Sequence, residues 1–187
     1  MQDDIKKACD VLKEGGLILY PTDTIWGIGC DATNAEAVKR IYALKQRDDN
    51  KSMLLLMDNP AKLHTYLKDV PDIAWDLIEL TDKPLTIIYD GAKNLAANLI
   101  AEDGSIGIRI TSELFSMRLC QQFRKPIVST SANISGDPSP ANFSQIGQAI
   151  KDGVDYIVTY RQKEQRRAQP SEIVQLGKEG SIKIIRK

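Results

Sequence analysis

The chain of 187 residues balances 25 Lys and Arg against 25 Asp and Glu, and 42% of its residues are hydrophobic. This length suits one domain, and the zero net charge means that any polyanion site must come from a local cluster of Lys and Arg. The three cysteines, Cys9, Cys30 and Cys120, lie far apart, which predicts reduced thiols rather than a disulfide framework or a structural zinc site. The sequence shows neither a signal peptide nor an apolar run long enough to span a bilayer, so we expect a soluble, cytoplasmic protein.

Apolar residues recur with helical or strand periodicity along the whole chain. Residues 3–14 place Ile5, Ala8 and Leu12 on one helical face, and Gly15 follows where such a helix would end. In chain order, we expect helix 3–14, strand 17–20, a loop or irregular strand 22–31, helix 34–45 capped by Asn34, strand 52–57, helices 61–66 and 71–80, strands 86–89 and 106–110, helix 113–123, strand 127–130, loop 131–140, helix 143–150, and strands 156–159, 172–176 and 183–186.

Helices and short strands interleave without any segment of linker composition, internal repeat or low complexity. The prediction is therefore one α/β domain over residues 1–187, with a twisted, mixed open sheet and helices on its outside. Since the elements do not alternate strictly as βαβα, a doubly wound Rossmann sheet is disfavoured. The sequence contains neither GxGxxG nor GxxxxGK[ST], so neither common nucleotide-binding loop can be invoked.

Three polar clusters lie beside expected strand ends, where α/β proteins commonly bind ligands. One, residues 20–24, carries Thr22, Asp23 and Thr24, whose hydroxyls and carboxylate suit a small polar ligand. Another, residues 129–133, presents small hydroxyl and amide side chains that let a ligand approach closely. Both segments are also compatible with ordinary turns stabilised by their own side chains.

The third cluster joins helix 34–45 to strand 52–57 and is rich in cations. If this connector bends, Lys45, Arg47 and Lys51 converge, and a planar guanidinium with two ammonium groups suits a polyphosphate. The alternative is a solvated charged turn in which Lys45 complements the helix dipole.

Other basic and aromatic residues favour simpler interpretations. The basic stretch 161–167 is typical of a solvated segment, and it is also the best candidate for a segment that contacts tRNA or closes over a ligand. His64, the only histidine, lacks a Ser or Cys partner pattern and is expected on the surface. Trp26 and Trp75 are expected in the core or in a pocket wall.

Six segments together resemble one family across nearly the whole chain. A K-x-R-x-x-x-K run followed later by an S-x-N run makes the combination specific. The chain is similar to the YrdC/YciO family of threonylcarbamoyl-AMP synthases through GGLILYPTDTIWGIGCDATN (15–34), IYALKQRDDNKSMLLLM (41–57), PLTIIY (84–89), SIGIRI (105–110), PIVSTSANISGDPSP (126–140) and PSEIV (170–174).

The resemblance implies a twisted open sheet around a large, positively charged central cavity. It also implies a nucleotidyltransferase that converts L-threonine, bicarbonate and ATP, with Mg²⁺ on the phosphates, into threonylcarbamoyl-AMP and pyrophosphate. The product supplies N6-threonylcarbamoyladenosine in tRNA, so tRNA contact and docking with the downstream threonylcarbamoyl transferase complex are suggested as well. No covalent enzyme intermediate is required, so catalysis can rest on positioning and on charge stabilisation at the phosphates.

By the same resemblance, the site residues divide between ATP and threonine, and Arg109 would bind the threonine carboxylate as a bidentate pair. No protein ligand for a metal is implied. The chain differs from the common family pattern at Leu56, Lys83 and Glu172. The implied set comprises catalytic Lys45, Arg47 and Lys51; ATP-binding Arg47, Lys51, Thr86, Ser131, Asn133 and Arg186; and threonine-binding Thr24, Arg109 and Ser171.

Two other functions remain open from the sequence. A YciO-type paralogue would keep the fold but have a different or weak adenylating activity, and the intact Ser131-Ala132-Asn133 favours the synthase over it. A module that binds tRNA or double-stranded RNA would clamp a nucleic-acid backbone in the basic cavity. Zero net charge and the lack of aromatic stacking motifs count against that module.

Overall fold

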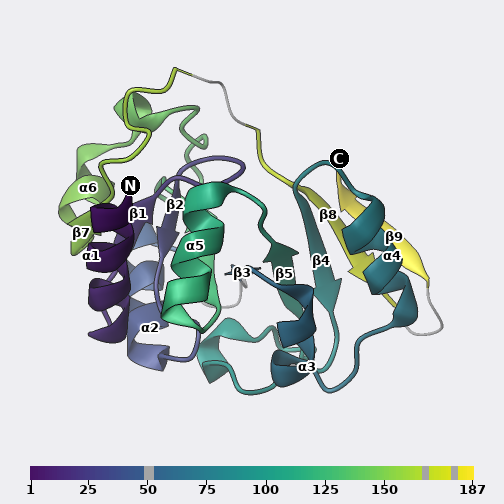
Figure 1. The fold of residues 1–187 in the computed structure, drawn as a ribbon. Helices are drawn as coiled ribbons and strands as arrows, with labels where there is room; N and C mark the ends of the chain where they lie inside the picture. The colour runs from purple at the N-terminus through teal and green to yellow at the C-terminus, as the bar shows by residue number, and fades with distance from the viewer. Residues whose placement is uncertain (49–52, 166–168, 178–180) are drawn as a thin grey trace.

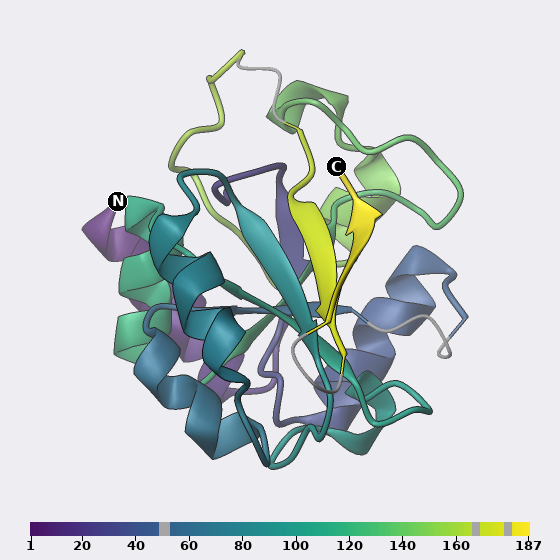
Figure 2. The same ribbon diagram turned by 90° about the vertical axis from the view of Figure 1, so that its right-hand side faces the viewer.

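One sheet runs through the molecule and carries helices on both faces (Figures 1 and 2). A computed structural model describes residues 1–48, 53–165, 169–177 and 181–187. Within these residues, nine strands follow one another in the order β7-β1-β2-β6-β3-β5-β4-β8-β9. The strands are β1 (Ile18–Tyr20), β2 (Gly27–Gly29), β3 (Leu54–Met57), β4 (Leu85–Tyr89), β5 (Ile106–Ile110), β6 (Ile127–Ser131), β7 (Tyr156–Ile157), β8 (Glu172–Leu176) and β9 (Ile182–Arg186).

The helices form two layers around this sheet. In the two ribbon views α1, α3, α4 and α5 lie on one face, and α2 lies on the other (Figures 1 and 2). The helices of the described residues are α1 (Gln2–Lys13), α2 (Ala35–Lys45), α3 (Leu63–Tyr66), α4 (Asp72–Leu80), α5 (Leu114–Phe123) and α6 (Gln148–Asp152), with the 3₁₀ helices η1 (Pro60–Lys62), η2 (Ala97–Leu99) and η3 (Phe143–Gln145).

The sheet mixes parallel and antiparallel pairs. β1 and β7, β3 and β5, and β4 and β8 run parallel, whereas β1 and β2, β2 and β6, β3 and β6, β4 and β5, and β8 and β9 run antiparallel. The order begins with β7 and ends with β9, so the sheet is open. The predicted α/β fold with a mixed open sheet is therefore confirmed, and a Rossmann order is not formed.

Alternation along the central strands separates a hydrophobic face from a polar one, because successive strand residues point to opposite sides. Ile87 and Tyr89 of β4 and Ile108 of β5 lie on the face of the sheet that α4 covers. Thr86 of β4 and Arg109 of β5 face a cavity on the other side. The apolar face is covered by α4, whereas the opposite face combines polar side chains with apolar ones such as Ile88 and Ile173.

Local signals in the sequence explain where several helices begin. Asn34 accepts hydrogen bonds from the backbone N–H groups of Glu36 and Ala37, both at 3.1 Å, as expected of an N-cap. Glu113 plays this part for α5, accepting from Ser116 N at 2.8 Å. At its other end, α2 stops at Gln46, whose φ of 48° is left-handed and turns the chain away from the helix axis.

Four elements differ from the sequence-based expectation. Helix 61–66 begins as the 3₁₀ helix η1 and is α-helical only in α3. Helix 143–150 is split into η3 and α6, because Ile146 and Gly147 take extended backbone angles between them. Strand 156–159 is shortened to β7. The segment 22–31 contains a regular strand, β2, with glycines at both ends: a Cβ on Gly29 would lie 2.7 Å from the ring of Tyr20 and 2.9 Å from the carbonyl oxygen of Val128. The bare Gly29 lets β1 and β6 approach β2 closely.

The cysteines agree with the prediction of reduced thiols. Cys9, Cys30 and Cys120 are all free and buried. Burial raises the pKa of the thiols of Cys30 and Cys120 far above the ordinary range, so both behave as small apolar side chains. Within the described part of the chain, no helix combines the length and the apolarity that a membrane crossing requires.

Candidate active site

A cavity of about 270 Å³ opens on the polar face of the sheet. It draws residues from β2, β3, β4, β5, β6, β8 and β9 and from the segments beside these strands. This volume approaches the lower end of small-ligand pockets, about 300 Å³. The lining comprises Thr24, Ile25, Trp26, Gly27, Arg47, Met53, Leu54, Thr86, Ile88, Ser105, Gly107, Arg109, Ser129, Thr130, Ser131, Ser139, Pro170, Ser171, Ile173 and Arg186.

The charged side chains of this lining are all cationic among the described residues: Arg47, Arg109 and Arg186. The lining also contains eight hydroxyl-bearing residues and two glycines, Gly27 and Gly107, which have no side chain that would narrow the cavity. Guanidinium groups bind carboxylates and phosphates through paired N–H donors, and hydroxyls both donate and accept hydrogen bonds. The cavity is therefore suited to a ligand that carries several negative charges.

At one end of the cavity, Arg109 connects β5 to the turn that follows β1. Its Nη2 lies 3.0 Å from Asp23 Oδ1 and 3.3 Å from Thr24 Oγ1. The side chains of Arg109 and Asp23 are only 3% and 11% exposed, and burial raises the pKa of Asp23 although the Arg109 charge opposes this. Arg109 Nε is buried and has no hydrogen-bond partner within the described residues.

A second group joins β4, β8 and β9. Thr86 Oγ1 and Ser171 Oγ lie 2.8 Å apart, and Arg186 donates from Nε to the Ser171 carbonyl oxygen at 2.9 Å. Burial and then the charge of Arg109 lower the pKa of Arg186, which places the two guanidinium groups in one electrostatic field. The expected assignment puts Ser171 with threonine and Thr86 and Arg186 with ATP. The structure brings these three residues into a single hydrogen-bonded group.

Lys45 behaves differently from the other basic residues of the connector. It is 1% exposed, and its ammonium group donates to the carbonyl oxygens of Ser131 and, at 2.6 Å, of Asn133. Burial, followed by the nearby charge of Arg47, lowers the pKa of Lys45 to about 8. Lys45 is not part of the cavity lining; it ties the end of α2 to the end of β6.

Asn133 also lies behind the lining rather than in it. Its Nδ2 donates to the carbonyl oxygens of Ile134 and Asp137 at 2.9 and 2.8 Å. The buried Oδ1 of Asn133 has no hydrogen-bond partner in the described part of the chain. The neighbouring Ser131 does line the cavity, so the segment 131–137 combines one cavity hydroxyl with a loop held by the Asn133 amide.

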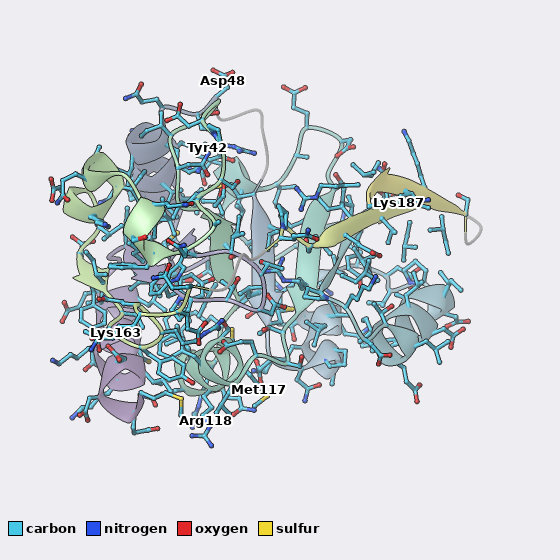
Figure 3. The ribbon with its side chains drawn as sticks, turned by 90° about the horizontal axis from the view of Figure 1, so that it is seen from above. Tyr42, Asp48, Met117, Arg118, Lys163 and Lys187 are labelled. Atoms are coloured by element: carbon cyan, nitrogen blue, oxygen red, sulfur yellow. The ribbon has the colours of Figure 1, made fainter. Side chains whose placement is uncertain are left out.

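Arg47 follows the left-handed Gln46 and contributes to the lining, whereas Lys51 lies outside the described residues. Seen from above, Tyr42 and Asp48 lie toward one edge of the molecule and Met117 of α5 lies at the opposite edge (Figure 3). The described start of the basic connector, residues 46–48, is thus on the face away from α5.

Several cavity residues were not singled out from the sequence, notably Ser105, Gly107 and Ser139. For Ser105 and Gly107 a signal was available, because they share one face with Arg109 at a spacing of two residues. A Cβ on Gly107 would meet the Thr86 side chain at 3.4 Å. Ser139 comes from the polar loop after β6, and no local pattern places it in the cavity.

Two aromatic contacts and one ion-paired arginine lie outside the phosphate and threonine sets. Trp26 is a cavity wall, packed on Phe143 with ring centroids 4.9 Å apart, as predicted. His64 is exposed beside Trp75, which agrees with a surface residue. In the basic stretch, Arg161 is held by neighbouring side chains, and Arg166 and Arg167 lie outside the described residues.

The three departures from the family pattern lie outside the lining as described. Leu56 is fully buried in β3. Lys83 Nζ and Glu172 Oε1 are 3.9 Å apart, with side chains 78% and 44% exposed, so they form a surface pair that is worth little. None of the three changes the described walls of the cavity.

The fold and the site together define an open-sheet α/β protein with an arginine- and hydroxyl-lined cavity for a polyanionic ligand. The sequence profile of the Sua5/YciO/YrdC family, described as telomere recombination, matches residues 10–187. The chain therefore belongs to this family, as the resemblance predicted.

Individual relatives support the same placement. The chain is 36% identical over 160 residues to the threonylcarbamoyl-AMP synthase of Pseudoalteromonas translucida. This match covers 84% of this chain and 86% of the relative. Its fold is similar to that of a P. abyssi Sua5 variant, with a TM-score of 0.89 at 25% identity, over 97% of this chain but 55% of that one. E. coli YciO matches with a TM-score of 0.86 at 25% identity, over 100% of this chain and 90% of that one. The chain thus spans about half the length of the P. abyssi protein.

Proposed function

We propose that this chain is a threonylcarbamoyl-AMP synthase that serves tRNA modification. The observation that carries the proposal is a hydroxyl-lined cavity with Arg47, Arg109 and Arg186 in a chain of this family. In the proposed reaction, the threonine amine and bicarbonate form a carbamate with loss of water. A carbamate oxygen then attacks the α-phosphorus of ATP, and the bond to pyrophosphate breaks. The protein supplies position and charge, with no covalent intermediate on the enzyme.

The ATP side of the cavity is proposed to comprise Arg47, Lys51, Ser131, Thr86 and Arg186. Arg47 and Arg186 offer paired N–H donors to phosphate oxygens, and the hydroxyls of Ser131 and Thr86 complete the hydrogen bonds. The described residues contain no cluster of three or more His, Cys, Asp or Glu that would hold a metal ion. We therefore assign Mg²⁺ to the ATP phosphates, as part of the substrate, and not to a protein cage.

Lys45 and Asn133 support this side from behind the lining. Lys45 holds the Ser131 and Asn133 carbonyl oxygens, and the Asn133 amide holds the loop that follows. Both residues fix the place of the Ser131 hydroxyl. The role proposed for Lys45 is therefore positional, with Arg47 nearer to the phosphates.

The threonine side is proposed to comprise Thr24, Arg109 and Ser171. Arg109 would bind the carboxylate, and the Thr24 and Ser171 hydroxyls would bind the remaining polar atoms of the amino acid. Asp23 keeps Arg109 in place and reduces its net charge, so the guanidinium is oriented before threonine arrives. The proposal further includes a single domain over residues 1–187, a cytoplasmic location, and delivery of the product to a tRNA-modifying transferase.

The deciding experiment measures pyrophosphate release from purified protein supplied with ATP, Mg²⁺, bicarbonate and L-threonine. Release should require both threonine and bicarbonate. In Arg47→Ala, turnover should be abolished while the melting temperature changes little, because Arg47 lies on the cavity wall and not in the core. Release that persists without threonine would reject the synthase assignment, and full activity in Arg47→Ala would remove the basic connector from the mechanism.

A second candidate is a YciO-type paralogue, favoured by the match to E. coli YciO over the whole of this chain. Such a protein would bind ATP in the same cavity but release pyrophosphate slowly or with another acceptor. An RNA-binding module, by contrast, would consume no ATP and would lose RNA affinity steeply as salt rises. The same purified protein therefore distinguishes all three functions.

A further inference from the structure

Arg161 braces the turn that carries Thr24 and is not itself part of the cavity lining. Its Nη1 donates to the Thr22 carbonyl oxygen at 3.1 Å and to Glu113 Oε1 at 3.2 Å. The side chains of Arg161 and Glu113 are 16% and 14% exposed, so their ion pair is largely shielded from solvent. A shielded pair holds its partners more firmly than a surface pair does.

Glu113 extends this brace into α5. Its other oxygen, Oε2, accepts from Ser116 N at 2.8 Å, and Ser116 Oγ donates to the Pro21 carbonyl oxygen at 3.1 Å. Two consecutive carbonyl groups, those of Pro21 and Thr22, are therefore each held by a side chain from another part of the chain. The start of α5 and the segment after β7 together fix how this turn sits in the molecule.

The turn itself is closed by its own hydroxyls. Thr22 Oγ1 donates to the Ile25 carbonyl oxygen at 2.7 Å and lies 3.1 Å from Thr24 Oγ1. These local bonds set the shape of the turn, but they do not set its orientation relative to β5. The orientation of the turn relative to β5 decides whether Thr24 Oγ1 can accept a hydrogen bond from Arg109 Nη2. In this structure the two atoms are 3.3 Å apart.

Arg161 occupies an uncommon backbone conformation, with a φ of 67° that few residues other than glycine adopt. Its Nε is also engaged, donating to Glu164 Oε2 at 2.9 Å. The guanidinium thus contacts two carboxylates and one carbonyl. A strained backbone whose side chain is so fully engaged is consistent with a residue kept for its precise placement.

We propose that Arg161, acting through Glu113 and the Thr22 carbonyl, is a positioning residue for the threonine side of the cavity. Arg161 is not among the residues that line the cavity, so its proposed action is indirect. Its loss should let the turn rotate, so that Thr24 and Arg109 no longer present their donors together. The inference rests on the proposed function, since it assigns the residue to the binding of threonine and not of ATP.

The test compares Michaelis constants for threonine and for ATP in pyrophosphate release. Arg161→Gln should raise KM for threonine by about tenfold or more and leave KM for ATP within about twofold, since small misplacements cost rate or affinity at the displaced group. Arg161→Lys keeps the positive charge and can still donate a hydrogen bond to one carbonyl oxygen. It should therefore show a smaller rise in KM for threonine than Arg161→Gln. In combination with Thr24→Ala, Arg161→Gln should add almost nothing, because both changes act on the same turn.

Arg40→Gln is the matched control. Arg40 also pairs with a carboxylate, Asp155 at 2.8 Å, and also bonds a backbone carbonyl, that of Gly15 at 3.3 Å, but it stands on the surface away from the cavity lining. Both Michaelis constants should stay within about twofold of the unchanged protein. A general loss of stability in Arg161→Gln would affect its two Michaelis constants alike, whereas a positioning role raises KM for threonine alone.

The outcomes are distinguishable. Equal rises in both Michaelis constants for Arg161→Gln, or a fall in melting temperature with both constants unchanged, would overturn the positioning role. If Arg161→Gln does not fold, Glu113→Gln decides, because it retains an acceptor for Ser116 N and removes only the charge that holds Arg161. Unchanged protein that releases no pyrophosphate with threonine would instead reject the proposed function, and this inference with it.

Discussion

The pair of Arg109 and Asp23 offers the sharpest separation of stability from ligand binding in this molecule. Their side chains are 3% and 11% exposed and 3.0 Å apart. Arg109→Met leaves the Asp23 carboxylate buried without its cation, and breaking such a pair costs about 3–5 kcal/mol of unfolding free energy. Asp23→Asn strands the guanidinium in the same way. Replacing both residues removes both charges, so the double variant should recover most of that loss.

Threonine binding should not recover in the double variant. A hydrogen bond to a charged group contributes about 1.5–3 kcal/mol, so loss of the Arg109 guanidinium should raise KM for threonine roughly 10- to 150-fold. This rise is expected in Arg109→Met with or without Asp23→Asn, and KM for ATP should change much less.

Urea unfolding measures the stability of the four proteins, and pyrophosphate release at varied threonine and ATP measures binding. The expected pattern is a strong coupling in stability, with no recovery of the Michaelis constant for threonine in the double variant. A double variant with normal KM for threonine would refute the assignment of Arg109 to the carboxylate. A single variant as stable as the unchanged protein would refute the claim that the pair is effectively buried.

Two further perturbations test the structure around the site. The pKa of Lys45 is lowered to about 8 from 10.5, so between these values the unfolded chain binds more protons and stability rises with pH. From pH 7.5 to 9.5 the unfolding free energy of the unchanged protein should therefore increase by about 2 kcal/mol more than that of Lys45→Met. Urea unfolding at both pH values measures this difference. Equal increases in the two proteins would show that Lys45 is not the titrating group. Gly29→Ala should cost about 1–3 kcal/mol, because the new methyl group meets the Tyr20 ring at 2.7 Å and the Val128 carbonyl oxygen at 2.9 Å. Gly147→Ala, where nothing lies within 4 Å, is the control and should stay within about 0.5 kcal/mol; similar melting temperatures for the two variants would contradict the close approach at Gly29.

Much of the secondary structure was predictable because its causes are local. The cap at Asn34, the apolar stripe of α1 and the alternation in β5 each depend on residues within one or two turns or one strand. Helix 143–150 was wrong as one element because Gly147 and its extended neighbour interrupt it, and a short apolar periodicity does not report such a break. The sequence does not predict β2 as a regular strand, because its glycines carry no strand propensity and are explained only by the strands on either side.

The site was predictable in its parts and not in its arrangement. The basic connector and the hydroxyl run stand out in the sequence, since charge and small polar side chains are visible there. Seven residues assigned from the sequence line one cavity: Thr24, Arg47, Thr86, Arg109, Ser131, Ser171 and Arg186. Their meeting depends on the order of the strands, which joins residues separated by more than a hundred positions.

By itself, the amino-acid sequence determined that this is one α/β chain of its family with cationic and hydroxyl-rich segments at strand ends. Only the tertiary structure decided which of those side chains face the cavity and which support it. Lys45 is buried because two carbonyl oxygens at the end of β6 accept hydrogen bonds from its ammonium group. Arg161 binds the Thr22 carbonyl oxygen, 139 residues away in the sequence, because Glu113 lies beside that turn and pairs with its guanidinium. Such partners are fixed by long-range packing, and no local pattern of residues records them.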